Sequence, residues 1–150
     1  MNTKTGYLFF IAFTLITAAL VFSSFKQQQE EPWTQDQLLE PSDLARILNN
    51  PKAKQPYVYS VGPDATIKNS IDIGPADNKE NLNELKKQLS KLPKDANIVI
   101  YCGCCPFIRC PNIRPAFTLL NEMKFTHQKL LSLQHNIKID WIDKGFPVSE

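Results

Sequence analysis

The chain has 150 residues, which is the size of one domain, and four of these residues are cysteines. Its formal net charge is +2, with 17 basic and 15 acidic residues mixed along the chain. No strongly basic face is expected from this balance, so nucleic acid is excluded as an expected partner.

An uncharged apolar run occupies residues 7–25. It is nineteen residues long, with Lys4 before it and Lys26 after it, and it fits either a secretory signal peptide or a single membrane anchor. Small residues at its end favour cleavage, whereas its length favours an anchor, so both interpretations stay open. Residues 1–25 are therefore expected to direct export. The remainder is expected to be periplasmic, or anchored at the extracytoplasmic side of a membrane through the uncleaved segment.

Residues 26–40 are mostly polar and are expected to be a linker to a domain that spans residues 41–150. Trp33 lies inside this stretch, and we expect it to pack back onto the domain. A short helix is then expected from Pro41, with Ser42 as its N-cap.

Apolar and amphipathic segments alternate along the rest of the chain. Strands are expected at 57–61, 71–73, 98–101 and 128–133, and helices at 79–90, from 113 onward and at 140–144. This alternation predicts an α/β fold with a small parallel sheet flanked by helices. In such sheets a ligand binds beyond the carboxyl ends of the strands.

All the cysteines lie in one loop between a strand and a helix. The strand at 98–101 is apolar or aromatic throughout, and Cys102 is the first residue after it. Asn112 is a plausible N-cap for the following helix, with Pro115 in its first turn. Unpaired backbone N–H groups and the helix dipole favour negative charge here, so this arrangement is expected to lower the pKa of a cysteine.

Several kinds of chemistry fit such a cluster. A thiolate could carry a sulfane sulfur as a persulfide, or could attack a disulfide that a neighbouring thiol then resolves. Soft thiolates could instead bind zinc or copper(I). Structural disulfides are a further possibility, although bridges within so short a loop would stabilise the fold little. The cysteines concerned are Cys102, Cys104, Cys105 and Cys110.

The segment 98–125, IVIYC…RPAFTLLNEMKF, resembles the active-site unit of rhodanese domains, in which a strand ends at the catalytic cysteine and the loop holds an anion. The ending DWIDKGFPV, residues 140–148, is similar to the Trp, Gly, aromatic and Pro pattern that closes this family. The segment Leu92-Pro93-Lys94-Asp95 fits as well. The resemblance covers about residues 41–150 and implies a rhodanese-like domain.

On the family pattern, Cys102 occupies the position of the persulfide-carrying nucleophile, and the other cysteines become resolving or auxiliary thiols. Arg109 and Arg114 are the expected side chains for binding anionic sulfur. The loop departs from the family because it is longer and carries extra cysteines. Cys104 stands five residues before Arg109, the spacing typical of the family, so a shifted register would make Cys104 the nucleophile.

The expected function is therefore sulfur transfer, as in a rhodanese-like sulfurtransferase, or thiol–disulfide exchange through Cys102. The expected partner is a small sulfur donor or a protein thiol, and no cofactor is expected. The alternative is a binding module in which Cys102, Cys104, Cys105 and Cys110 hold a metal on a non-catalytic rhodanese scaffold.

Overall fold

The computed structural model of this chain describes residues 30–149. The expected signal peptide or anchor at residues 1–25 lies outside these described residues. Between residues 30 and 149, no helix combines the length and the apolar character needed to cross a membrane.

Five short strands form one sheet: β1 (Leu38–Leu39), β2 (Tyr57–Ser60), β3 (Ile71–Asp72), β4 (Ile98–Tyr101) and β5 (Gln128–Leu131). Their order across the sheet is β1-β5-β4-β2-β3, and every neighbouring pair is parallel. The predicted α/β class with a small parallel sheet is confirmed. Strand β4 is central, so the residue that follows it lies in the middle of the carboxyl edge.

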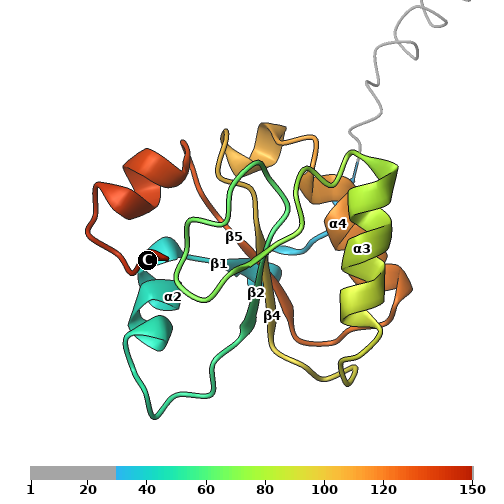
Figure 1. The fold of residues 1–150 in the computed structure, drawn as a ribbon, viewed down its shortest axis with the longest axis horizontal. Coiled ribbons are helices and arrows are strands. Elements are labelled where there is room, and N and C mark those ends of the chain that lie inside the picture. Colours follow the sequence, from blue (N-terminus) through green and yellow to red (C-terminus); the bar gives the residue numbers. More distant parts are fainter. Residues whose placement is uncertain (1–29, 150) are drawn as a thin grey trace, which may run out of the picture. The chain divides into compact units, whose positions relative to one another are not determined.

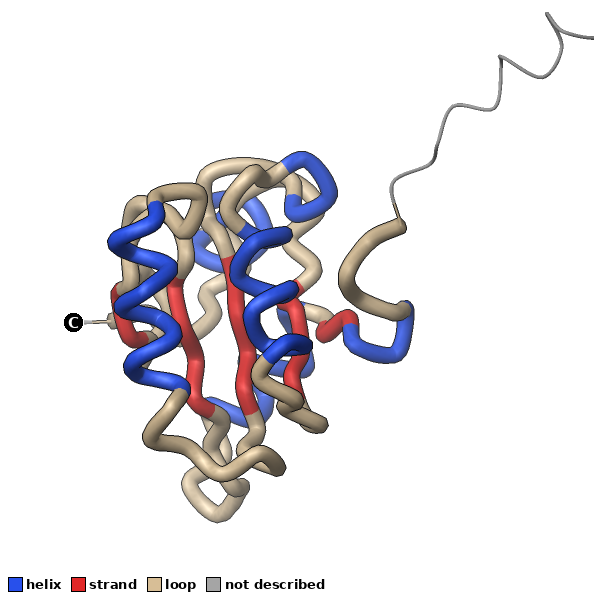
Figure 2. The backbone as a smooth tube through the Cα atoms, turned by 90° about the vertical axis from the view of Figure 1, so that its right-hand side faces the viewer, coloured by secondary structure: helices blue, strands red, loops and turns tan. Residues whose placement is uncertain are grey.

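Helices cover both faces of this sheet (Figure 1). They are α2 (Pro41–Leu48), α3 (Lys79–Leu89) and α4 (Ile113–Glu122), with the short turns η1 (Gln35–Gln37), η2 (Phe107–Arg109) and η3 (Lys138–Ile142). Figure 2 looks onto the face that α3 and α4 cover, while α2 lies on the opposite face. The two helical layers explain why the residues of β4 can all be apolar or aromatic.

Side chains of β4 alternate between two cores. Ile98 and Ile100 pack in the core that includes residues of α3 and α4, and Val99 and Tyr101 pack in the core that includes residues of α2 and Trp141. All four residues of the strand are buried. A strand covered on both faces has no polar side, which is the physical reason for its continuous apolar run.

Two expected helix boundaries are wrong. Helix α2 has Glu40 rather than Ser42 at its N-cap, because Pro41 takes the first helical position, where its fixed φ suits the helix. The last helical turn, η3, begins at Lys138 rather than at residue 140. Asn136 starts it early, because its side-chain oxygen accepts the backbone N–H of Ile139 at 3.0 Å.

The described part of the expected linker at 26–40 belongs to the domain. Leu38 and Leu39 pair with β5 as strand β1, and the compact unit begins at Glu31. Trp33 is buried as expected, with its ring 6.2 Å from that of Phe107 and 5.9 Å from that of Phe117. Two leucines are too short a run to signal a strand, so the sequence pattern missed this edge of the sheet.

Candidate functional site

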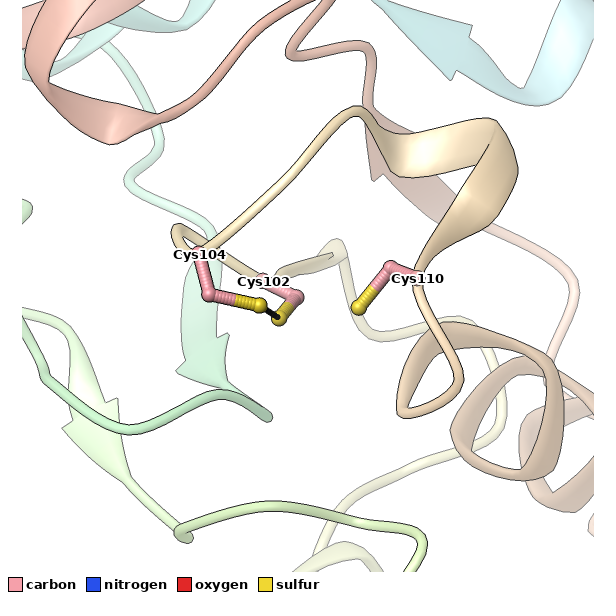
Figure 3. A group of neighbouring side chains, drawn as sticks. All are labelled: Cys102, Cys104 and Cys110. Carbon is pink, nitrogen blue, oxygen red and sulfur yellow. Dashed lines mark hydrogen bonds between the residues drawn. The ribbon is translucent and has the colours of Figure 1, made fainter.

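The cysteine loop leaves the carboxyl end of β4 and returns to α4. Strand β4 lies between β2 and β5, so Cys102 emerges at the centre of the sheet edge. The sulfurs of Cys102, Cys104 and Cys110 all lie within 4.8 Å of one another (Figure 3). All four cysteines are free thiols in this structure. The fold therefore gathers three sulfurs at the place where α/β sheets bind ligands.

The sulfurs differ in their contacts and in their exposure. Cys104 Sγ lies 3.3 Å from Cys102 Sγ and 3.3 Å from Cys105 Sγ. Cys102 is only 1% exposed and Cys110 is 0% exposed, whereas Cys104 is exposed and Cys105 is half-buried. Cys104 thus connects the buried sulfur of Cys102 with the surface.

Two backbone hydrogen bonds attach the loop to the segment after β5. Phe107 donates its N–H to Leu133 O, and Ile137 donates its N–H to Gly103 O, each at 2.9 Å. A Cβ at Gly103 would lie 2.8 Å from Ile137 Cβ, a distance that no real pair of such atoms keeps. The loop can therefore pass close to Ile137 only with glycine between Cys102 and Cys104.

Asn112 contacts the nucleophile candidate directly. It stands at the predicted N-cap position of α4, but its side chain makes no capping hydrogen bond. Its Oδ1 instead accepts the N–H of Asp77 at 3.1 Å, and its Nδ2 donates to Cys102 Sγ at 3.5 Å. Asn112 is 5% exposed, so this amide is fixed within the protein beside the sulfur.

The cluster concentrates one negative charge on Cys102. The pKa of Cys102 is lowered to about 5, first by the hydrogen bond from the Cys110 thiol, against the opposing effect of burial. The backbone N–H of Cys104, the Asn112 amide and the Cys104 thiol lower this pKa further. Each of these groups donates to the sulfur and so stabilises its anionic form.

The neighbouring thiols keep their protons. The pKa of Cys104 is raised to about 12, first by burial and then by the hydrogen bonds that its thiol makes to Cys102 and Cys105. The pKa of Cys110 is raised as well, first because its thiol is hydrogen-bonded to Cys102. The reduced cluster is therefore a single thiolate surrounded by thiol donors.

The two arginines do not take part in this cluster. Arg109 is exposed, and it forms no salt bridge with any residue between 30 and 149. Arg114 Nη2 lies 2.6 Å from Glu31 Oε1 and 2.8 Å from Ile108 O, and its guanidinium lies 5.6 Å from the Trp33 ring centroid. The contacts of Arg114 thus join the start of the domain to α4, and neither arginine is among the groups that lower the pKa of Cys102.

The comparisons with known proteins show the fold alone. No family model and no curated protein matches the chain. Among solved structures, a cysteine-to-serine variant of EanB with hercynine matches with a TM-score of 0.52 and 17% sequence identity. The match covers 75% of this chain and 27% of the EanB chain. A threonine-to-valine variant of EanB with hercynine has a TM-score of 0.55 and 16% identity, and covers 81% and 29%. This chain thus spans less than a third of EanB.

Proposed function

We propose that residues 31–149 form a rhodanese-like domain in which the Cys102 thiolate performs sulfur chemistry outside the cytoplasm. The thiolate accepts a sulfane sulfur as a persulfide, or it attacks a disulfide. The observation that carries this proposal is the setting of Cys102 Sγ: it follows the central strand, is 1% exposed, and lies 3.5 Å from Asn112 Nδ2 and 3.3 Å from Cys104 Sγ. These neighbouring groups lower the pKa of Cys102. The thiolate is the reactive form of cysteine, so this geometry supplies a nucleophile at neutral pH.

Further support comes from the position of Cys102 and from the neighbours in structure. Cys102 follows the central strand of a parallel sheet, where α/β folds place their ligands. The likeness to EanB supports an α/β fold of this topology, and a cysteine is the residue replaced in one of those hercynine complexes. The rhodanese pattern in the sequence independently selects Cys102.

The transfer step is balanced with a persulfide as donor. The Cys102 thiolate attacks the terminal sulfur of R–S–S⁻, a bond forms from Cys102 Sγ to that sulfur, and the old S–S bond breaks. The products are Cys102–S–S⁻ and R–S⁻. Because Cys102 is 1% exposed, we expect small donors to react and bulky ones to be excluded.

Mass spectrometry tests this assignment. Reduced protein treated with a small hydropersulfide donor and sampled at once is expected to gain the mass of a sulfur atom on the peptide that contains Cys102. Cys102→Ser is expected to lose this gain completely. Cys105→Ser is the matched control, because the Cys105 sulfur contacts Cys104 and not Cys102, and it is expected to react like the wild type. An undiminished adduct in Cys102→Ser would reject the role of Cys102.

A second candidate function, a metal-binding module, is favoured by the three sulfurs within 4.8 Å of one another. Three thiolates suit copper(I), and zinc would need one more ligand. Binding must first displace the protons that Cys104 and Cys110 retain. Metal analysis of protein purified under reducing conditions separates the candidates. A metal module predicts stoichiometric zinc or copper that both Cys104→Ser and Cys110→Ser lose, whereas the sulfur-transfer function predicts substoichiometric metal in all variants.

A further inference from the structure

We propose that Cys104 resolves the Cys102 persulfide: its thiol displaces the terminal sulfur as hydrosulfide and leaves a Cys102–Cys104 disulfide. The domain would then reduce a sulfane sulfur to sulfide, and would not hand the sulfur to a separate acceptor. This inference rests on the proposed function, because it begins with a persulfide on Cys102.

The geometry selects Cys104 among the three other thiols. Its Sγ lies 3.3 Å from Cys102 Sγ, so a shift of roughly 1.3 Å would bring the sulfurs to disulfide bonding distance. Cys105 touches the sulfur of Cys104 and not that of Cys102. Cys110 is fully buried, and its Sγ lies within 4.8 Å of Cys102 Sγ without a contact as short as the 3.3 Å that separates Cys104 Sγ from Cys102 Sγ.

The step balances without an external oxidant. The reactants are Cys102–S–S⁻ and Cys104–SH, and the products are Cys102–S–S–Cys104 and HS⁻. A bond forms between the two Sγ atoms, and the bond from Cys102 Sγ to the terminal sulfur breaks. The Cys104 proton passes to the anionic terminal sulfur as Cys104 Sγ attacks, so the attacking sulfur acquires thiolate character during the step. The electron pair of the broken bond leaves with the terminal sulfur, which departs as HS⁻. The cysteines are oxidised and the sulfane sulfur is reduced.

The exposure of the two sulfurs explains how the disulfide could be reopened. Cys104 is exposed and Cys102 is 1% exposed, so an external dithiol reaches the Cys104 end of the bridge. Attack on Cys104 Sγ expels the Cys102 thiolate. Thiol–disulfide exchange is faster when the leaving thiol has a low pKa, and the pKa of Cys102 is lowered whereas that of Cys104 is raised. Attack at the exposed Cys104 sulfur is therefore also the reaction that expels the better leaving group, the Cys102 thiolate.

A single-turnover experiment tests the inference. Fully reduced protein, freed of reductant, is mixed with an equimolar hydropersulfide donor; released sulfide is assayed, and the modified peptides are mapped by mass spectrometry over time. The wild type is expected to release sulfide in proportion to protein and to end with Cys102 bonded to Cys104. Cys104→Ser is expected to keep the persulfide and to release no sulfide above the rate of the donor alone. Cys105→Ser keeps both sulfurs of the Cys102–Cys104 pair and is expected to end with the same bridge.

The outcomes separate the two proposals. A wild type that holds its persulfide as long as Cys104→Ser does would overturn the role of Cys104 and leave the persulfide function intact. The same conclusion follows if Cys110→Ser, and not Cys104→Ser, stops sulfide release. A wild type that gains no sulfur, releases no sulfide and forms no bridge would instead overturn the persulfide reaction of the proposed function, on which this inference rests. Cys104→Ala, which changes an exposed side chain, repeats the test if the serine variant folds poorly.

Discussion

The ultraviolet absorbance of a thiolate is expected to persist in the reduced protein well below neutral pH and to disappear with a midpoint at about 5, the pKa of Cys102. A lowered pKa means that the anion survives to lower pH than in an ordinary thiol, so the signal is lost as the pH falls. At pH 7 an ordinary cysteine with a pKa of about 8.5 is only about 3% thiolate, whereas Cys102 is expected to be about 99% thiolate. A pH titration of the absorbance measures this directly and needs no reagent to reach the buried sulfur.

Three variants give the assignment its controls. Cys102→Ser is expected to lose the transition near pH 5 and to titrate only in the alkaline range. Cys110→Ala removes the thiol that contributes most to lowering the pKa of Cys102, so its midpoint is expected to rise. Cys105→Ser, whose sulfur does not contact Cys102, is expected to keep the wild-type midpoint. Reduced wild-type protein with no thiolate signal at pH 7 would contradict the proposed nucleophile.

The effect of the lowered Cys102 pKa on its reaction rate depends on pH. The intrinsic nucleophilicity of a thiolate falls as its pKa falls, with a Brønsted slope of about 0.4–0.5, which roughly cancels the gain in thiolate fraction at pH 7. Cys102 is therefore expected to react faster than an ordinary thiol below neutral pH, where ordinary thiols are protonated. It is also expected to be the better leaving group in any step that expels the Cys102 thiolate. We expect the rate of sulfur uptake to be nearly constant with pH above about 6, in parallel with the thiolate absorbance.

Replacing Gly62 by alanine is expected to destabilise the domain by about 1–3 kcal/mol, a typical cost of overpacking. A Cβ at this position would lie 2.8 Å from Cys102 Sγ and 3.3 Å from Gly103 N. The sulfur would have to leave its present position, in which the Asn112 amide donates to it, so the midpoint of the thiolate titration is expected to rise as well. Urea unfolding of the reduced variant measures the stability change.

A double-mutant cycle shows whether the sulfur is the cause. Cys102→Ala removes Sγ, and the remaining contacts of the new Cβ, at 3.3 and 3.4 Å, are tight but closer to ordinary packing. Gly62→Ala is therefore expected to cost much less in the Cys102→Ala background than in the wild type. Equal losses of stability in both backgrounds would show that the glycine is needed for some other reason.

The sequence predicted the structure best where the pattern of apolar residues is continuous or regularly repeated along the chain. The apolar run of β4 and the alternation of strands with helices predicted the parallel sheet, because both depend on local periodicity. Strand β1 was missed, because two leucines carry no periodicity and pair with β5 only through the tertiary fold. The expected linker was set too long for the same reason.

For the candidate site, too, the local features could be predicted from the sequence, whereas the contacts between distant residues could not. A thiolate at Cys102 could be inferred from the strand-to-helix loop, but its stabilisation was assigned to arginines and the helix dipole. The structure adds two neighbours that lower the pKa of Cys102, the Cys110 thiol and the amide of Asn112, which also accepts the N–H of Asp77 from another loop. Arg114 is instead paired with Glu31, a partner 83 residues away in the chain. Such distant partners leave no spacing signal, so only the fold reveals them.

The contrast between the buried sulfur of Cys102 and the exposed sulfur of Cys104 has a consequence for selectivity. Under the proposed function, a donor that reacts at Cys102 is expected to be narrow, because this sulfur is buried, whereas a protein partner is expected to reach only the exposed Cys104. Since the two sulfurs are 3.3 Å apart, electrons can cross from one class of partner to the other through a single bond. The loop would thus sort its reactants by size, with metabolite-sized donors on the inner side and macromolecular reductants on the outer side.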